Sequence, residues 1–305
     1  MKMKTILTAV AAAAIAVCAQ AQQGVRKVAP AGQDYTIGSV MAASGSNVTY
    51  QWFRDGQPIA GATSASYTVP ASLAKHENGL IVRYTHGSRF QRAAYGIDCA
   101  GGVAMSNSVT VYFCDLMVNG VCWARANSNN VALISSNPWD DGALYQWNMP
   151  SVGYSTTAGT LSGFSATPDL AATWTNGVPC PAGWRLPTKQ DCENLLAASQ
   201  PVGGVWVEGG VRGIPAGVNG SLLGYNTNFC TMTNMAGCVF LPASGFRTGA
   251  SGTNSYYGRM GRYWASEHNS FQNGVTLYVT ETDNGYVSYA GKTGAETIRC
   301  VQDVQ

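Results

Sequence analysis

The stretch CPAGWRLPT at residues 180–188 decides the fold of the C-terminal half of this chain. Three later stretches belong with it in a fixed order: FLPASGFR at residues 240–247, YWASE at residues 263–267 and IRCV at residues 298–301. Together the four stretches span about 120 residues. Prolines, glycines and aromatic residues recur in them, which is typical of short strands joined by turns.

A helix is expected directly after the first stretch. Thr188 can cap the helix, and Asp191 stands at the position of the acidic partner in a capping box, although Glu is the more usual residue there. The pattern predicts a helix from Lys189 to Ala198. Its apolar face carries Cys192, Leu195 and Leu196, and we expect this face to pack on the sheet that holds residues 298–301.

The four stretches resemble the Fibrobacter succinogenes major paralogous (FISUMP) domain, a module of secreted bacterial surface proteins. The segments at residues 121–127 (VCWARAN) and 145–148 (YQWN) are similar to further parts of that domain. The RLPT core also resembles the formylglycine-generating enzymes, whose fold is related to C-type lectins, with Asp191 in place of their Glu. The resemblance implies an α+β, C-type-lectin-like domain over residues 115–303, loop-rich and with few short helices.

The N-terminal part has the pattern of a small all-β domain. Candidate strands at residues 48–53, 64–69, 79–84 and 108–113 are separated by turns such as Asp55–Gly56, which predicts a β-sandwich over residues 25–113. The stretch YQWFRDGQPI at residues 50–59 is similar to bacterial immunoglobulin-like repeats. The early strands hold no cysteine, so we expect Trp52 to pack on an aliphatic core instead of on an inter-sheet disulfide. Spacing or assembly is the expected role of this domain.

The first 21 residues have the order of a signal peptide. Lys2 and Lys4 precede an apolar run at residues 5–17, and Ala19-Gln20-Ala21 forms a small-x-small cleavage site. The run is too short for a membrane-spanning helix. Acylation of Cys18 is the alternative, but Val17 stands where a small residue is expected. The sequence therefore predicts an exported protein that is secreted, periplasmic or attached to the cell surface.

Removing the signal peptide leaves an even number of cysteines, which indicates disulfides in an exported chain. The chain has no Cys-x-x-Cys, so a zinc site is not indicated. A local bridge is expected between Cys230 and Cys238. The family resemblance implies that Cys300 pairs with either Cys180 or Cys192. C-type-lectin-like folds commonly bridge a cysteine of the first helix to the final strand, which favours Cys192. The FISUMP pattern also includes a cysteine at the position of Cys180, so the choice is open. The disulfide candidates are Cys99, Cys114, Cys122, Cys180, Cys192, Cys230, Cys238 and Cys300.

Charge gives little indication of a partner. Only 11% of residues are charged and the formal net charge is +2, with no basic run. We therefore do not expect the protein to bind nucleic acid through electrostatic attraction.

Aromatic and arginine residues of the second domain are the candidates for ligand binding. Seven of the eight tryptophans lie there, and we expect Trp123, Trp184 and Trp264, which lie within the family motifs, to be in the core. Trp139 and Trp174 lie in turn-rich segments and are candidates for exposed rings. The loop at residues 255–263 adds a glycine-separated cluster that is typical of recognition loops, and its candidate residues are Tyr256, Tyr257, Arg259 and Arg262.

No catalytic or metal motif was found. The chain lacks Gly-x-Ser-x-Gly, His268 is the only histidine of the second domain, and the cysteine motif of the formylglycine-generating enzymes is missing. The calcium-binding tripeptides of sugar-binding C-type lectins are also missing. We therefore expect no cofactor and no metal.

The sequence predicts a secreted or surface-exposed, adhesin-like binding protein that is not an enzyme. Its expected ligand is a glycan or a host or matrix protein. The alternative is a structural or accessory subunit of a surface (fimbrial) assembly, with other subunits as partners. A formylglycine-generating type of enzyme is the third hypothesis.

Overall fold

The computed structural model describes residues 25–30, 34–38, 48–70, 88–95, 103–106 and 109–303, the last range with gaps at 130–134, 136, 152, 157–163, 166, 168, 182, 233–234, 236 and 249–251. The signal-peptide prediction for residues 1–21, the strand predicted at 79–84 and the disulfide candidate Cys99 lie outside the described residues. Contacts between Cα atoms divide the chain into two compact units. Among the described residues, unit 1 ends at Phe113 and unit 2 begins at Cys114.

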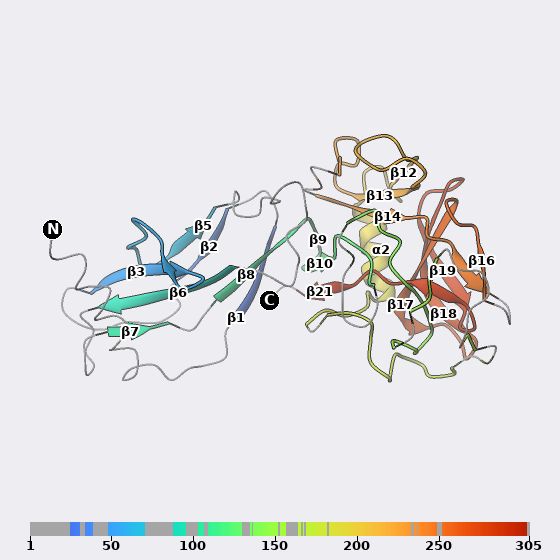
Figure 1. Ribbon diagram of the computed structural model, residues 1–305, viewed down its shortest axis with the longest axis horizontal. Coiled ribbons are helices and arrows are strands. Elements are labelled where there is room, and N and C mark those ends of the chain that lie inside the picture. The colour runs from blue at the N-terminus through green and yellow to red at the C-terminus, as the bar shows by residue number, and fades with distance from the viewer. Residues whose placement is uncertain are drawn as a thin grey trace. The chain divides into compact units, whose positions relative to one another are not determined.

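Unit 1 consists of strands in two sheets (Figure 1). The larger sheet has the order β1-β8-β6-β3-β4, with β7 beside β6, and β2 pairs with β5. The bounds are β1 Val25–Pro30, β2 Tyr35–Ile37, β3 Thr49–Arg54, β4 Gln57–Pro58, β5 Tyr67–Val69, β6 Ser88–Tyr95, β7 Val103–Met105 and β8 Val109–Cys114. The predicted turn joins β3 to β4, with Asp55 and Gly56 both at positive φ, as a two-residue hairpin requires.

Trp52 lies in the core of unit 1. Its side chain is fully buried in a cluster with Ile37 and Val69 of the smaller sheet and Val109 and Val111 of the larger one. The expectation of an aliphatic core around Trp52 is confirmed. Trp52 of β3 and the alternating residues Val109 and Val111 of β8 face this cluster, so burial of one sheet face against the other stabilises the unit.

Unit 2 contains three further sheets. Their orders are β21-β10-β9, β12-β13-β14 and β16-β15-β20-β17-β18-β19, with β11 beside β20. The pairing of β17 with β20 is parallel. The bounds are β9 Leu116–Val118, β10 Val121–Trp123, β11 Leu144–Gln146, β12 Val205–Val207, β13 Gly220–Gly224, β14 Cys238–Pro242, β15 Phe246–Thr248, β16 Thr253–Ser255, β17 Met260–His268, β18 Asn273–Thr280, β19 Tyr286–Gly291, β20 Ala295–Thr297 and β21 Val301–Asp303.

Helix α2 (Lys189–Ala198) has the bounds and the cap that the sequence predicts. The Thr188 hydroxyl accepts a hydrogen bond from the Asp191 backbone N–H at 3.0 Å, and the Asp191 carboxylate accepts one from the Thr188 N–H at 2.8 Å. Arg185 also contacts the Asp191 carboxylate at 2.6 Å. These reciprocal bonds satisfy backbone donors that a helix start leaves free.

The apolar face of α2 packs in the main core of unit 2, where the helix contacts β9, β13, β17, β18 and β19 (Figure 1). Cys192, Leu195 and Leu196 lie there with residues of the three sheets. The core also contains Val301, as expected from the sequence. Trp123, Trp184 and Trp264 are buried, with 1%, 8% and 0% of their surface exposed, which confirms their assignment to the core.

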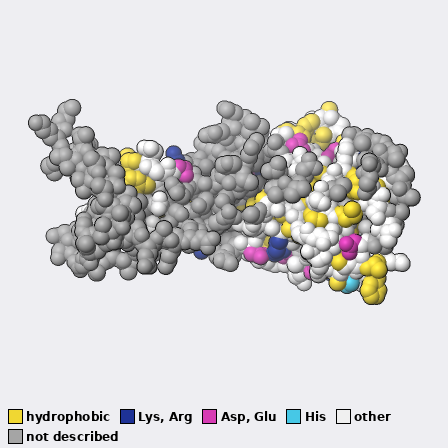
Figure 2. Space-filling model, turned by 60° about the horizontal axis from the view of Figure 1, so that its bottom comes forward, with side chains coloured by type: hydrophobic (Ala, Val, Ile, Leu, Met, Phe, Trp, Pro, Cys, Tyr) yellow, Lys and Arg dark blue, Asp and Glu magenta, His cyan; other side chains and the backbone are white. Residues whose placement is uncertain are grey.

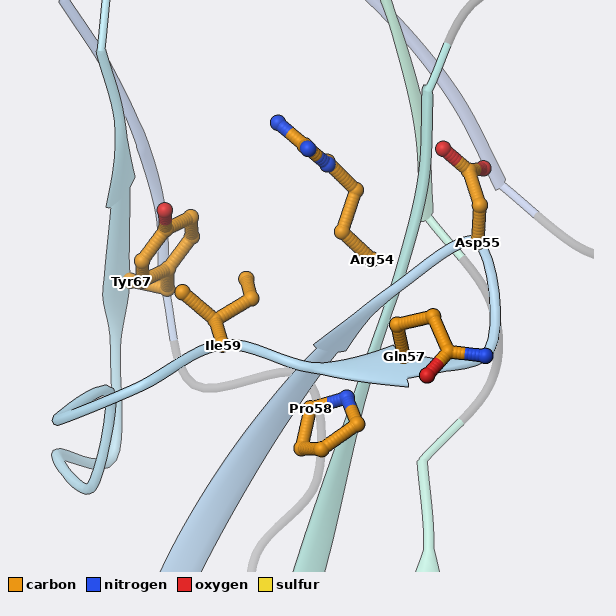
Figure 3. A pocket seen from close by; sticks show the side chains of 6 residues that line it. All are labelled: Arg54, Asp55, Gln57, Pro58, Ile59 and Tyr67. Carbon is orange, nitrogen blue, oxygen red and sulfur yellow. The ribbon is translucent and has the colours of Figure 1, made fainter.

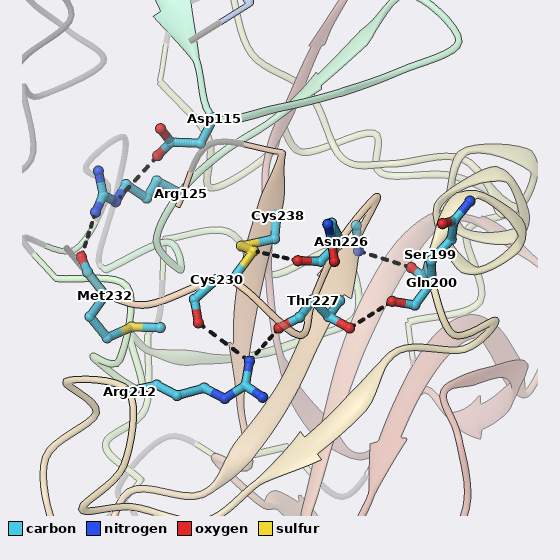
Figure 4. Close-up of a disulfide and its surroundings, with 11 residues drawn as sticks. Asp115, Arg125, Ser199, Gln200, Arg212, Asn226, Thr227, Cys230, Met232 and Cys238 are labelled. Carbon is cyan, nitrogen blue, oxygen red and sulfur yellow. Dashed lines mark hydrogen bonds and ion pairs between the residues drawn. A yellow bond between two sulfur atoms is a disulfide. The ribbon is translucent and has the colours of Figure 1, made fainter. Parts of the chain in front are cut away.

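Three disulfides stabilise unit 2: Cys114–Cys122, Cys180–Cys300 and Cys230–Cys238. Figure 4 shows the last of these, with Arg212 donating hydrogen bonds to the carbonyl oxygens of Thr227 and Cys230. The bridge and this arginine fix the loop between β13 and β14. The expected local bridge is therefore present.

The open choice at Cys300 is decided in favour of Cys180. Arg185 and Val301 exchange two backbone hydrogen bonds of 2.8 Å, which hold the segment before α2 beside the last strand. This places the Cα atoms of Cys180 and Cys300 5.8 Å apart, within disulfide reach. Cys192 as a disulfide candidate was wrong. Its side chain points into the main core, where it stays a free thiol, and burial raises its pKa well above the usual range.

Candidate functional site

A row of stacked side chains crosses the seven-stranded sheet of unit 2. Tyr256 stacks on Phe246, with ring centroids 5.7 Å apart and planes inclined by 13°. The guanidinium of Arg262 lies 3.3 Å from the Phe246 centroid and 4.9 Å from that of Tyr278. Tyr278 in turn stacks on Tyr286 at 5.0 Å and 7°. We call these five residues the aromatic–arginine ladder.

Strand register builds the ladder. Arg262 of β17 is the partner of Tyr278 of β18, which is the partner of Tyr286 of β19. A bridge between Gly245 and Gly261 brings β15 close to β17 and so places Phe246 beside Arg262. The neighbouring residues of β17 and β18 point to the opposite face, where Tyr263 and Leu277 belong to the main core. The ladder therefore lies on the sheet face that is turned away from α2.

The ends of the ladder are open to solvent, whereas its middle is mostly buried, with only Arg262 partly exposed. Tyr256 is 56% exposed and Tyr286 38%, whereas Phe246 and Tyr278 are buried. The Arg262 side chain is 20% exposed. On the face of unit 2 that Figure 2 shows, hydrophobic side chains lie among few charged ones. Flat rings held in place by neighbours can stack on an apolar ligand face at little entropic cost.

Tyr256 is held in an unusual backbone conformation. Its φ is +58°, a region that bulky residues seldom adopt, and its carbonyl oxygen accepts hydrogen bonds of 3.0 Å from the N–H groups of Arg259 and Met260. Strained residues of this type are concentrated at functional sites. The tight turn presents the Tyr256 ring at the end of the ladder.

A buried carboxyl group lies behind Arg262. Glu296 of β20 is 1% exposed, its Oε1 lies 3.8 Å from Nη1 of Arg262, and its Oε2 accepts a hydrogen bond of 2.9 Å from Thr276. Among the described residues, Oε1 of Glu296 and Nε of Arg262 have no hydrogen-bond partner. Burial raises the pKa of Glu296 to about 7, against the opposing effect of Arg262. Because Glu296 is only partly ionised near neutral pH, its negative charge compensates only part of the positive charge of Arg262.

The other two loop candidates are paired at the surface. The Tyr257 hydroxyl donates a hydrogen bond of 2.9 Å to Asp141; partial burial and this carboxylate raise the pKa of Tyr257 to about 12. Arg259 forms an exposed ion pair with Glu281, its Nε 2.6 Å from Oε1. All four loop candidates thus lie in one loop and the strand after it, but only Tyr256 and Arg262 belong to the ladder.

The two tryptophan candidates are half-buried. Trp139 packs on an apolar cluster formed by β12, β13 and β14. Trp174 packs on Trp147 with centroids 5.5 Å apart, and Trp147 packs edge-on against Trp264 at 5.4 Å. Trp139 and Trp174, the candidates for exposed rings, are thus only partly exposed, because neighbouring aromatic and apolar side chains cover much of their surface.

Sequence reasoning missed Phe246, Tyr278, Tyr286 and Glu296. One signal was available for two of them. The segment DNG at residues 283–285 is typical of a turn between strands, and Tyr278 and Tyr286 are paired across the connection that contains it. Phe246 and Glu296 come from strands distant in sequence, so no local pattern joins them to Arg262.

A buried cation, Lys292, lies near Trp147. Lys292 donates a hydrogen bond of 2.7 Å to the carbonyl oxygen of Ala171, and its Nζ lies 4.9 Å from the Trp147 ring centroid and 3.5 Å from Nδ1 of His268. Burial lowers the pKa of Lys292. These contacts fasten the loop that carries Trp174 to the sheet.

In the part of the chain that the structure describes, no group of three or more His, Cys, Asp or Glu side chains could hold a metal ion. Within the same residues, no helix is both long and apolar enough to cross a membrane.

Comparison with known proteins found few similarities. No protein-family model matches the chain, and no curated protein matches it. Among solved structures, Sidekick-1 immunoglobulin domains 1–4 have 11% sequence identity and a TM-score of 0.24, over 93% of this chain and 74% of that one. Drosophila OTK extracellular domains 3–5 have 8% identity and a TM-score of 0.18, over 90% of this chain and 65% of that one. TM-scores this low carry no argument about this protein.

Proposed function

We propose that this chain is an exported, non-catalytic, adhesin-like binding protein and that the aromatic–arginine ladder is its ligand-binding surface. The observation that carries the proposal is the ladder itself, a continuous stack whose terminal rings, Tyr256 and Tyr286, are open to solvent. Side chains that form only a core seldom leave large rings exposed at both ends. Three disulfides support the assignment to an oxidising compartment outside the cytoplasm.

A glycan is the ligand class that this surface suits best. The faces of tyrosine rings can pack on the apolar side of a pyranose, and the guanidinium of Arg262 between them can donate hydrogen bonds to hydroxyl or carboxylate oxygens. The Arg259–Glu281 pair adds polar groups from the same loop and strand end. A host or matrix protein with an exposed polar–aromatic patch is the second ligand class.

We also propose that unit 1 is immunoglobulin-like and that unit 2 is a FISUMP domain of C-type-lectin-like fold. The sequence motifs support both proposals. So does the placement of the CPAGWRLPT stretch, which leads into α2 and is bridged to the final strand through Cys180 and Cys300. In this arrangement unit 1 serves as a spacer or as an assembly module, and unit 2 binds the ligand.

The purified protein should be screened on an array of glycans and extracellular-matrix proteins, with Tyr256→Ala/Tyr286→Ala beside the wild type. We expect the double variant to keep its fold and to lose about tenfold or more in affinity, the loss typical of anchor residues at interfaces. Phe229→Ala is the matched control, since Phe229 is 77% exposed and lies outside the ladder.

Two results would count against the proposal. If the double variant binds as the wild type does, the ligand site lies elsewhere. If the wild type binds nothing on the array, the alternative of a structural subunit in a surface assembly becomes the better hypothesis, and mixing with other envelope proteins is the next test.

A further inference from the structure

Unit 1 has a cavity of about 310 Å³ beside the β3–β4 hairpin. Its lining comes from the end of β3, the hairpin turn, β4, the residue after it and β5: Arg54, Asp55, Gln57, Pro58, Ile59 and Tyr67. Figure 3 shows the side chains of Arg54 and Tyr67 rising on the same side, with Ile59 between them. The volume lies at the small end of the range for ligand pockets, so it suits a single amino-acid residue or a molecule of that size.

The walls of this cavity are fixed by the core of unit 1. The Ile59 N–H donates to the carbonyl oxygen of Trp52 at 2.9 Å, and the Gln51 carboxamide donates to that of Ile59 at 2.7 Å. The indole N–H of buried Trp52 donates to the carbonyl oxygen of Ser64 at 2.9 Å. The Tyr67 ring packs on Trp52 with centroids 5.8 Å apart. The wall formed by Ile59 and Tyr67 is therefore preformed, which lowers the entropic cost of binding.

The polar groups of the cavity favour an anion. The Arg54 side chain is exposed and has no hydrogen bond or ion pair within the described ranges of the chain. A guanidinium binds a carboxylate through two parallel hydrogen bonds. The Gln57 carboxamide, also part of the lining, is a further group that can donate. Asp55 is the one acidic residue of the lining, and it lies at the rim beside Arg54 (Figure 3).

The remaining surface is apolar. Ile59, Pro58 and the ring of Tyr67 offer an aliphatic and aromatic wall next to the guanidinium. We propose that this cavity binds the C-terminal residue of a peptide, with its carboxylate on Arg54 and an apolar side chain against Ile59 and Tyr67. The site lies in unit 1 and does not depend on the ladder of unit 2.

The test is a titration of the isotope-labelled full chain with N-acetyl-Gly-Leu, followed in ¹⁵N–¹H spectra, beside the same peptide ending in an amide. We expect the free carboxylate to bind and to shift the signals of residues 54–59 and 67. The amide should bind about tenfold more weakly or worse, as should the free peptide on Arg54→Ala, because a charge-assisted hydrogen bond is lost. Asp55→Asn should strengthen binding by removing a competing negative charge.

Arg259→Ala is the matched control, since it removes an exposed arginine of unit 2 and should leave this affinity unchanged. The signal of the buried Trp52 indole reports whether each variant keeps its fold. Equal affinity for the acid and the amide, wild-type affinity in Arg54→Ala, or no shift at millimolar peptide would overturn the proposal. Equal binding of an amidated peptide with an internal aspartate would overturn the assignment to a terminal carboxylate.

Discussion

Arg262 lies with its guanidinium 3.3 Å above the centroid of the Phe246 ring, and this contact joins β17 to β15 across the outer face of the sheet. The side chain also faces Glu296, which lies beneath it in β20. Arg262 therefore connects the exposed ladder to the one buried carboxyl group behind it. The stability of the sheet and the charge of the ladder both depend on this residue.

Replacing Arg262 with methionine should destabilise the protein more at pH 8 than at pH 5. Methionine keeps much of the apolar stem but leaves Glu296 buried without its cation. At pH 8, one unit above the folded-state pKa of Glu296, this removes the compensation of an ionised group and costs up to about 1.4 kcal/mol, because beyond that the variant binds a proton at Glu296. At pH 5 Glu296 is protonated, so the variant should lose little stability. Urea unfolding at both pH values measures the difference.

Arg259→Met is the control for that experiment. Its ion pair with Glu281 is exposed to solvent, so the variant should unfold at nearly the same urea concentration as the wild type at either pH. Equal losses for Arg262→Met at pH 5 and pH 8 would contradict the coupling between Arg262 and Glu296.

Glu296→Gln should remove a pH dependence of stability. The folded-state pKa of Glu296 is about 7, above its ordinary value, so the folded protein binds this proton more tightly than the unfolded chain does. The contribution to stability is full below about pH 4.5 and is lost as the pH rises through 7, by at most about 3 kcal/mol. The charged group facing Glu296 is Arg262; Thr276 and Tyr278 are its polar neighbours.

The measurement is the difference in unfolding free energy between pH 5 and pH 8. Glutamine can still accept the Thr276 hydrogen bond and carries no charge, so the wild type should lose more stability than the variant over this interval. An identical pH profile in the two proteins would show that Glu296 titrates normally.

Core and loop residues should respond in opposite ways to truncation. Trp184 is 8% exposed, and Trp184→Ala should cost about 3–5 kcal/mol. Tyr257→Ala with Arg259→Ala removes side chains at the surface, and the double variant should unfold at nearly the same temperature as the wild type. Thermal unfolding followed by circular dichroism compares them. If the loop variant unfolds while Trp184→Ala stays folded, the assignment of Trp184 to the core and of the loop residues to the surface is wrong.

Thiol counting should find few reactive cysteines. In the native protein Cys192 should not react, because it is buried and its thiol pKa is raised. After unfolding without reductant, Cys192 should react, together with any contribution from Cys99, and the six bridged cysteines should not. The sample must come from the cell envelope. Reaction of half or more of the cysteines would contradict the disulfide framework.

The bridge between Cys180 and Cys300 should contribute the most stability of the three. It closes the longest loop, with a sequence separation of 120 compared with 8 for each of the others. Constraint of the unfolded chain grows with loop length, so Cys180→Ser/Cys300→Ser should cost roughly 4 kcal/mol. Urea unfolding midpoints of this variant and of Cys230→Ser/Cys238→Ser provide the comparison.

Local features were determined by the sequence alone. Helix α2 was predicted with its bounds because Thr188 and Asp191 satisfy its first backbone donors and because Cys192, Leu195 and Leu196 follow one another at helical spacing. The hairpin turn at Asp55–Gly56 was predicted because those residue types tolerate positive φ. In each case the interactions that decide the structure lie within a few residues of chain.

The ladder and the pairing of Cys300 were decided only by tertiary structure. Phe246, Arg262 and Glu296 meet because β15, β17 and β20 are neighbours in one sheet, and no periodicity specifies which distant strands pair or in what register. Cys180 and Cys192 both lie near the CPAGWRLPT stretch, and the sequence left them equivalent. Backbone hydrogen bonds between Arg185 and Val301 selected Cys180, while packing of the helix turned Cys192 into the core. Periodicity and capping specify single elements, whereas contacts between elements depend on how all of them bury their apolar faces together.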